Sequence, residues 1–220
     1  MQKIANVKGV YSHFKVHMLD KVLHDFLVIW ATIDPIGTMA LFAALTAKLP
    51  ADRRRKTAFK TVGYAAIVLI GAIVIGQLLL TAMGISLLSF QVAGGIILFL
   101  FGLQMIFADE AQQGDVESQH DISVFPLAIP ATASPGAILA VILITDNHIY
   151  SVQEQVISAI TMLVVLLITL LLLLLSERIL KVIGVGGASI LTRIMGLILA
   201  ALSVEFVMEA LGVAKWVANN

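Results

Sequence analysis

Two short segments of this sequence combine a proline with residues that could bind a small charged molecule. Asp34-Pro35-Ile36-Gly37 lies in one long apolar run, and Ser134-Pro135-Gly136 lies in another, a hundred residues later. A proline lacks the backbone N–H and displaces the carbonyl four residues before it. In a helix, Pro35 and Pro135 would therefore free the carbonyls of Ala31 and Ala131 to accept hydrogen bonds from other groups.

The groups exposed at such breaks suit a zwitterion. A helix that restarts after a break presents unpaired N–H groups and the positive end of its dipole, which can hold a carboxylate. Unwound carbonyls can hold an ammonium or a metal cation. The sequence therefore predicts a substrate site made of Asp34, Pro35, Gly37, Ala31, Ser134, Pro135, Gly136 and Ala131. The alternative is a pair of kinks that only shape the packing of two helices.

Asp34 is the most informative of these residues. It lies near the middle of a membrane-length run, where a charged side chain costs on the order of 3 kcal/mol on insertion scales, so a function is the default expectation. Asp34 could bind a proton or Na⁺, or receive the ammonium group of a substrate. It could also cap the helix that restarts at Pro35, since Asp before a proline in the first turn suits an N-cap.

Other polar residues fall inside apolar runs. Gln104 and Glu205 are candidates for an inward-facing polar layer, and Glu209 shares a helical face with Glu205 or lies at the membrane interface. Gln77 and Gln91 are expected to form hydrogen bonds between helices. The set His13, His17 and His24 shares one face, but no carboxylate or thiolate completes it, so we predict no metal and no cofactor beyond coupling to H⁺ or Na⁺.

The composition is that of an integral membrane protein. Of 220 residues, 60% are apolar and 13% are charged, and the mean hydropathy is +1.01. The 14 basic and 14 acidic side chains cancel, so we expect no nucleic-acid partner. Cysteine is absent, which excludes thiol chemistry and disulfides. No motif for intramembrane catalysis is present, and we predict that the protein is not an enzyme.

Runs of about twenty apolar residues predict six membrane-spanning helices. They fall at 25–47, 61–83, 85–107, 125–145, 156–175 and 190–212. The chain then divides into an amphipathic interfacial segment at 1–22, a three-helix unit at 23–108, an acidic polar linker at 109–124, a second three-helix unit at 125–212 and a tail at 213–220. The segment at 1–22 could lie on the membrane surface or dock on the loops of the bundle.

The two three-helix units resemble each other. An offset of 100 residues places Asp34-Pro35 on Ser134-Pro135, and an offset of 101 places the Gly-Ile-Ile-Leu at 95–98 on the Gly-Leu-Ile-Leu at 196–199. Because each unit has an odd number of spans, two similar units would lie in the membrane with opposite orientation. The sequence thus predicts an all-α protein of two inverted repeats, with the first and fourth helices broken at proline. Chance similarity between apolar segments is the alternative.

The distribution of Lys and Arg predicts the orientation. Basic residues concentrate at 48–60 and 178–193, and few occur in the connections on the other side. This favours a cytoplasmic location for the basic connections, with both termini outside the inner membrane. The four lysines at positions 3, 8, 15 and 21 argue for the opposite orientation.

Five motifs together resemble a known family. They are Ile33-Asp34-Pro35-Ile36-Gly37, Phe90-Gln91-Val92-Ala93-Gly94-Gly95-Ile96, Phe125-Pro126-Leu127-Ala128-Ile129-Pro130, Ser134-Pro135-Gly136-Ala137-Ile138 and Leu191-Thr192-Arg193-Ile194-Met195-Gly196-Leu197. The combination resembles the MarC family of bacterial and archaeal integral membrane proteins, over nearly the whole chain. The family usually has Gly-Pro-Gly where this chain has Ser134-Pro135-Gly136, so a hydroxyl enters the predicted site.

The resemblance implies a function. MarC proteins resemble the LysE-type amino-acid exporters, which implies an inner-membrane secondary transporter that exports or exchanges small neutral amino acids or similar metabolites. The alternative is a membrane regulatory or assembly protein that transports nothing. The expected partners are the lipid bilayer and a small-molecule substrate, and the glycine-rich helix faces would permit a homo-oligomer.

Overall fold

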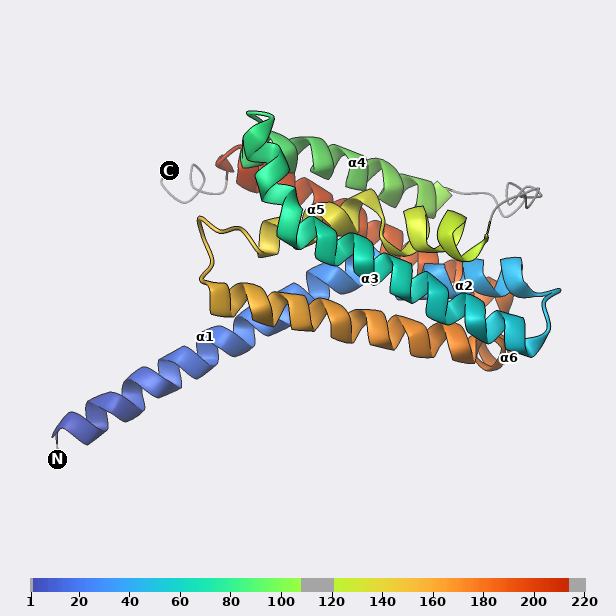
Figure 1. The fold of residues 1–220 in the computed structure, drawn as a ribbon, viewed down its shortest axis with the longest axis horizontal. Coiled ribbons are helices and arrows are strands. Elements are labelled where there is room, and N and C mark those ends of the chain that lie inside the picture. The colour runs from blue at the N-terminus through green and yellow to red at the C-terminus, as the bar shows by residue number, and fades with distance from the viewer. Residues whose placement is uncertain (1, 108–120, 214–220) are drawn as a thin grey trace.

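The computed structural model describes residues 2–107 and 121–213, with only the backbone for 2–17 and Val185. Every regular element in that part of the chain is a helix (Figure 1). The elements are α1 (Gln2–Ile33), α2 (Pro35–Thr46), α3 (Ala51–Ala82), α4 (Leu87–Phe107), η2 (Ser123–Thr132), α5 (Pro135–Ile144) and α6 (Val152–Ala210). The prediction of an all-α protein is confirmed. Most of the linker predicted at 109–124 and nearly all of the tail at 213–220 lie outside the described residues.

Five helical segments in the described part are long and apolar enough to cross a membrane. They are Met18–Thr46, Ala51–Ala82, Leu87–Phe107, Val152–Gly184 and Gly186–Ala210. The pair formed by η2 and α5, bent by 53°, adds a sixth if it counts as one span. With that pair included, each predicted span falls on one of the six.

Two boundaries differ from the predicted ones. Helix α1 continues without a break from Gln2 to Ile33, so residue 22 is not a helix boundary, and its first turns project away from the other helices (Figure 1). A location on the membrane surface stays a prediction. The connection expected between 175 and 190 is helical, and the chain changes direction at Gly184, whose φ of 69° suits glycine.

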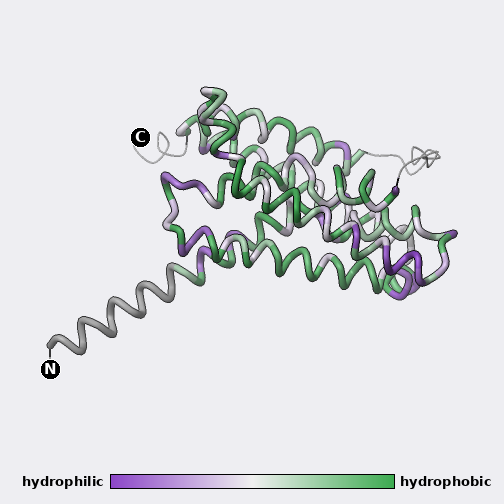
Figure 2. Tube along the Cα trace, in the orientation of Figure 1, coloured by the Kyte–Doolittle hydropathy of each residue, from purple (hydrophilic) through white to green (hydrophobic). Residues whose placement is uncertain are grey.

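The bundle has two chemically distinct ends. The end that contains Lys21, the turn at 83–86 and the loop at 145–151 is called here the terminal end, because α1 enters and α6 leaves there (Figure 1). The opposite end, with the loop at 47–50 and the bend at Gly184, is called the basic end. Hydrophilic residues gather at these two ends, and hydrophobic residues cover the length between them (Figure 2).

Ion pairs tie helices together at the basic end. Arg54 at the start of α3 pairs with Glu177 of α6. Lys60 donates to Asp121 over 2.8 Å, and this bond, with two further bonds from Ser123, holds the pKa of Asp121 at about 2. Asp121 therefore stays charged at neutral pH, and the chain that enters η2 is attached to α3.

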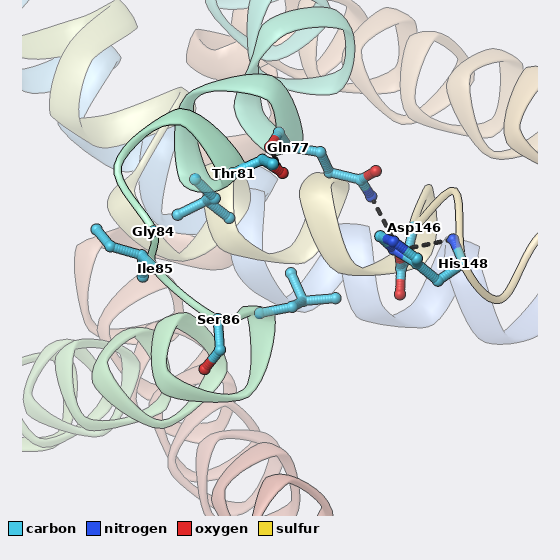
Figure 3. A pocket seen from close by; sticks show the side chains of 9 residues that line it. Gln77, Thr81, Gly84, Ile85, Ser86, Asp146 and His148 are labelled. Atoms are coloured by element: carbon cyan, nitrogen blue, oxygen red, sulfur yellow. Dashed lines mark hydrogen bonds and ion pairs between the residues drawn. The ribbon is translucent and has the colours of Figure 1, made fainter.

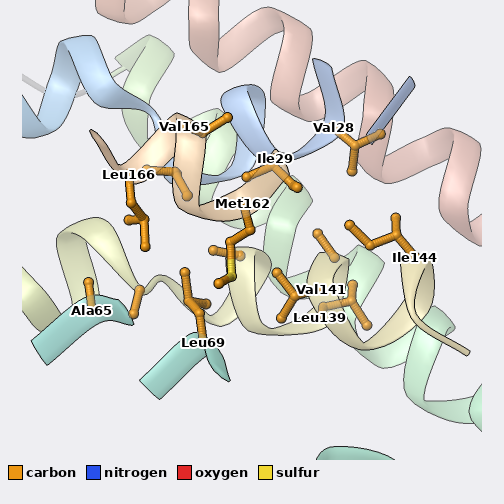
Figure 4. Close-up of a cluster of buried hydrophobic side chains, with 14 of the residues drawn as sticks. Val28, Ile29, Ala65, Leu69, Leu139, Val141, Ile144, Met162, Val165 and Leu166 are labelled. Carbon is orange, nitrogen blue, oxygen red and sulfur yellow. The ribbon is translucent and has the colours of Figure 1, made fainter. Parts of the chain in front are cut away.

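Helix α5 occupies the middle of the bundle. Seven of its ten residues are buried. Val141 packs in one apolar cluster with Ile29 of α1, Leu69 of α3 and Met162 of α6, each at most 1% exposed (Figure 4). Because lipid is as apolar as these side chains, close van der Waals contact, rather than exclusion from water, is what favours this packing.

Helix α4 packs closely against the last part of α6 at glycine residues, and this contact is called here the glycine seam. A Cβ added to Gly102 would lie 2.8 Å from the carbonyl oxygen of Gly196, and one added to Gly95 would lie 3.1 Å from that of Ser203. These contacts set an antiparallel register. The glycine faces that could have served an oligomer are thus used within the chain.

This seam predicts a selective effect of an added methyl group. Gly102→Ala is expected to destabilise the protein by about 1–3 kcal/mol, because its Cβ would meet the backbone of Gly196 and Ala200. The control is Gly71→Ala in α3, where nothing lies within 4 Å of the new Cβ and helix propensity favours alanine by up to about 1 kcal/mol. Thermal unfolding of the purified proteins in mild detergent measures both. Equal melting temperatures would contradict this account of the seam.

Candidate functional site

Asp34 is the residue between helices α1 and α2. Its φ of 47° is left-handed, and its Oδ1 accepts a hydrogen bond of 3.1 Å from the Gly37 N–H. A Cβ on Gly37 would lie 2.0 Å from Oδ2, so only glycine permits this approach. The N-cap interpretation is therefore confirmed. Among the described residues, the Gly37 N–H is the single donor to this carboxylate.

Ser134 occupies the corresponding place before α5. Its Oγ accepts from the Ala137 N–H over 3.0 Å, as Asp34 does from Gly37, and a proline follows both caps. The same hydroxyl donates to the carbonyl of Thr32 in the last turn of α1, over 2.9 Å. Ser134 thus caps one helix and supplies a donor to another.

The two capped breaks lie against each other. Besides the bond from Ser134 to Thr32, the Thr38 hydroxyl of α2 lies 3.4 Å from the carbonyl oxygen of Ala131 and 3.3 Å from that of Ile33. Ala131 was expected to have a free acceptor, and the structure gives that acceptor a partner on the other broken segment. The predicted residues Ala31, Pro35 and Gly136 are buried near these contacts, whereas the Pro135 ring is exposed.

The breaks lie well inside the bundle, and their helices run in opposite directions. Asp34 is about 20 Å of helix from Lys21 at the terminal end and about 18 Å from Thr46 at the basic end. Helix α2 runs from its break toward the basic end, and α5 runs toward the terminal end (Figure 1). Two helix N-termini therefore meet at mid-depth, one capped by a carboxylate and one by a neutral hydroxyl.

Residues 19–215 match the family described as "MarC family integral membrane protein". The chain belongs to the MarC family. It is therefore a multi-pass integral membrane protein, as the resemblance of its motifs predicted.

Several relatives of this MarC chain cover nearly its full length. A UPF0056 membrane protein of Buchnera aphidicola subsp. Schizaphis graminum is 29% identical over 201 residues, covering 91% of this chain and 100% of the relative. One from Methanocaldococcus jannaschii is 34% identical over 192 residues (84% and 93%), and one from Archaeoglobus fulgidus is 32% identical over 197 residues (85% and 90%). No solved structure matches the chain.

Two predicted polar candidates of this MarC protein are not brought to the breaks. Gln104 and Glu205 are both exposed, and the antiparallel register of α4 and α6 places Gln104 near Gly196 and Glu205 near Gly95, far from each other. The inward-facing polar layer is therefore absent among these residues, because the glycine seam occupies the inward face. Glu209 is exposed too, and accepts a 3.1 Å bond from Gln91, which confirms the interhelical role of Gln91.

The sequence reasoning missed a buried polar layer at the terminal end. Lys21 and Asp25 of α1 form an ion pair of 3.1 Å, and their side chains are 6% and 1% exposed. Ser158 of α6 donates to the same carboxylate over 2.6 Å. The spacing of Lys21 and Asp25, one helical turn apart at the start of an apolar run, is the signal that could have indicated this pair.

A cavity of about 330 Å³ lies beside this layer, between the α3–α4 turn and the loop after α5 (Figure 3). Asp146, 3% exposed, accepts from the His148 ring over 3.0 Å and from the Gln77 amide over 3.3 Å. Gln77 also donates to the carbonyl of Thr145, so its expected interhelical role is confirmed. The side chains of His13 and His17 lie outside the described part.

Because Ser134 has two roles, its loss is predicted to lower stability more than the loss of an ordinary helix cap. Ser134→Ala removes a cap and the bond to Thr32, and should lower stability by about 2 kcal/mol. The control is Ser151→Ala, which removes only the local, exposed bonds of a capping box with Glu154 and should cost about 1 kcal/mol. Unfolding in mild detergent measures the two losses. Equal losses would mean that the bond between the two breaks contributes nothing.

Proposed function

We propose that this MarC protein is a secondary transporter of small neutral amino acids or similarly small zwitterions in the inner membrane. The proposed substrate site consists of Asp34, Pro35, Gly37, Ala31, Ser134, Pro135, Gly136 and Ala131. The observation that carries the proposal is the mid-depth carboxylate of Asp34, which has a single described donor, the Gly37 N–H. An ionisable group at that depth with spare acceptor capacity suits a cationic ligand.

The substrate class follows from the two caps. Asp34 would take an ammonium group, and the N-terminus of α5, whose cap is the neutral Ser134, would take a carboxylate. The bonds from Ser134 to Thr32 and from Thr38 to Ala131 keep these two positions close together. A short spacing between the charges is that of an α-amino acid and excludes long substrates with widely separated charges.

The transport cycle would use two inverted repeats. Two observations support this arrangement. Both caps receive an N–H three residues later, at positions that correspond at an offset of 100. In addition, at an offset of 101, Gly95 corresponds to Gly196 and Gly102 corresponds to Ser203. The contact between Gly95 and Ser203 therefore has a counterpart in the contact between Gly196 and Gly102, and both are present. Rocking of one repeat against the other would expose the breaks to each side in turn, and Asp34 could couple the motion to H⁺ or Na⁺.

The transport proposal predicts that Asp34→Asn abolishes flux. Purified protein in proteoliposomes should take up and exchange labelled glycine, alanine, serine or threonine. The transport rate of the variant should be at least about tenfold lower, because the uncharged amide cannot pair with the ammonium group of the substrate. Imposed pH and Na⁺ gradients identify the coupling ion. Asp20→Asn, at an exposed acid of α1, is the control and should transport normally.

Two results would contradict this function. Unchanged flux in Asp34→Asn would remove the central site from the mechanism. Absence of flux for every one of these substrates in folded native protein would favour the regulatory or assembly role over transport.

The proposed orientation, with the basic end in the cytoplasm, predicts a labelling pattern. The chain contains no cysteine, so single-cysteine variants report cleanly. Ser86→Cys, exposed at the terminal end, should react with a membrane-impermeant maleimide added to intact spheroplasts. Lys48→Cys, exposed at the basic end, should react only after lysis. The reverse pattern would place both termini inside.

A further inference from the structure

The ammonium group of Lys21 lies in a site with three binding contacts. It donates to Asp25 Oδ2 over 3.1 Å and to the carbonyl oxygen of Ile144 over 3.3 Å, and it lies 3.7 Å from the centre of the Tyr150 ring. These contacts come from α1, from the last residue of α5 and from the loop that follows. Two oxygen acceptors and an aromatic face match the three N–H donors of a primary ammonium group.

The site is held in place by residues other than Lys21. Ser158 of α6 donates to Asp25 Oδ2 over 2.6 Å and also lies 3.3 Å from the Ile144 carbonyl oxygen. The ring nitrogen of His24 lies 3.5 Å from the other oxygen of Asp25. Because Ser158 contacts both acceptors, the carboxylate and the carbonyl would remain aimed at one point if Lys21 moved away.

The site lies at the terminal end of the bundle. It joins α1, α5 and the first part of α6, and its backbone acceptor, Ile144, is the last residue of α5. The first turn of the same helix lies at the central break, about 15 Å away. The central break and this site therefore lie at the two ends of α5.

We propose that Asp25, Ser158, the Ile144 carbonyl and the Tyr150 ring form a second binding site, specific for a primary ammonium group, which Lys21 occupies while the terminal end is closed. The amino group of the substrate displaces Lys21 as it enters or leaves. Assigning the ligand as a substrate rests on the proposed transport function. The ammonium site itself rests on the contacts of Lys21.

The buried charge explains why displacement must be an exchange. Asp25 is 1% exposed on its side chain, and departure of Lys21 alone would leave its carboxylate without its lysine partner, with only the ring of His24 nearby. An arriving ammonium replaces that counter-charge one for one. The aromatic face and the two hydrogen-bond acceptors favour an ammonium over Na⁺, which prefers a shell of oxygen atoms.

Chemical rescue tests the site directly. Lys21→Ala should lower the melting temperature of the purified protein by roughly 10 °C, because it removes the ammonium partner of the buried Asp25 carboxylate. Methylammonium or ethylammonium chloride should restore at least half of that loss in a saturable manner, whereas NaCl at equal ionic strength should not. The double variant Lys21→Ala/Asp25→Asn should show no rescue, and the native protein should show no shift.

A second variant decides the outcome if Lys21→Ala does not fold. Lys21→Arg keeps the charge but presents a planar guanidinium, which a small ammonium displaces less readily. Its flux in proteoliposomes should fall at least about fivefold, with a melting temperature within about 2 °C of the native one. Lys60→Arg, at the basic end, is the control and should behave as native.

The outcomes separate the two proposals. Rescue of Lys21→Ala by alkylammonium, with no flux in native liposomes, would retain the ammonium site and refute transport. Flux in native protein without rescue would retain transport and refute the ammonium site. If Lys21→Ala does not fold, native flux in Lys21→Arg would refute the site as well, and rescue by NaCl as strong as by amines would identify a Na⁺ site instead.

Discussion

The absence of water in the bilayer core is the constraint on which this structure depends. A helix interrupted at mid-depth exposes backbone groups that lipid cannot satisfy. Here each interrupted segment supplies a hydroxyl to the other: Ser134 donates to Thr32 and Thr38 to Ala131. Each break thus has at least one backbone carbonyl that accepts a hydrogen bond from the other segment. The pairing brings two helix N-termini to one point, so the solution to a solvation problem also creates a polar site.

The remaining contacts hold that point between two very different ends. At the basic end, the pairs Arg54–Glu177 and Lys60–Asp121 each include a side chain that is more than half exposed, so they contribute little to stability. At the terminal end, the charges of Lys21 and Asp25 are buried. The seam between α4 and α6 depends mainly on close packing at glycine, with one hydrogen bond, from Gln91 to Glu209. Unpairing the buried charges at the terminal end would therefore cost the protein more than breaking the exposed pairs at the basic end.

Much of the fold could be predicted from the sequence, because spans depend on local composition. The apolar runs and the motifs around Pro35 and Pro135 located the spans and the two polar segments that meet. Local composition does not show which distant segments contact each other. Nothing local shows that Gly102 faces Gly196, and this packing is what turns Gln104 and Glu205 outward. Lys21 was assigned to a surface segment because its buried partners, Ile144 and Tyr150, lie more than a hundred residues away.

The two caps differ where the two halves otherwise correspond, and that difference has a physical consequence. Identical caps would present the same charge from both directions, so a zwitterion could bind in either sense. With a carboxylate at Asp34 and a hydroxyl at Ser134, the dipole of α2 is neutralised and that of α5 is not. Under the transport proposal, a zwitterion would have one favourable orientation, with its ammonium toward α2. The two caps share one hydrogen-bond geometry, and a single acid makes their charges differ.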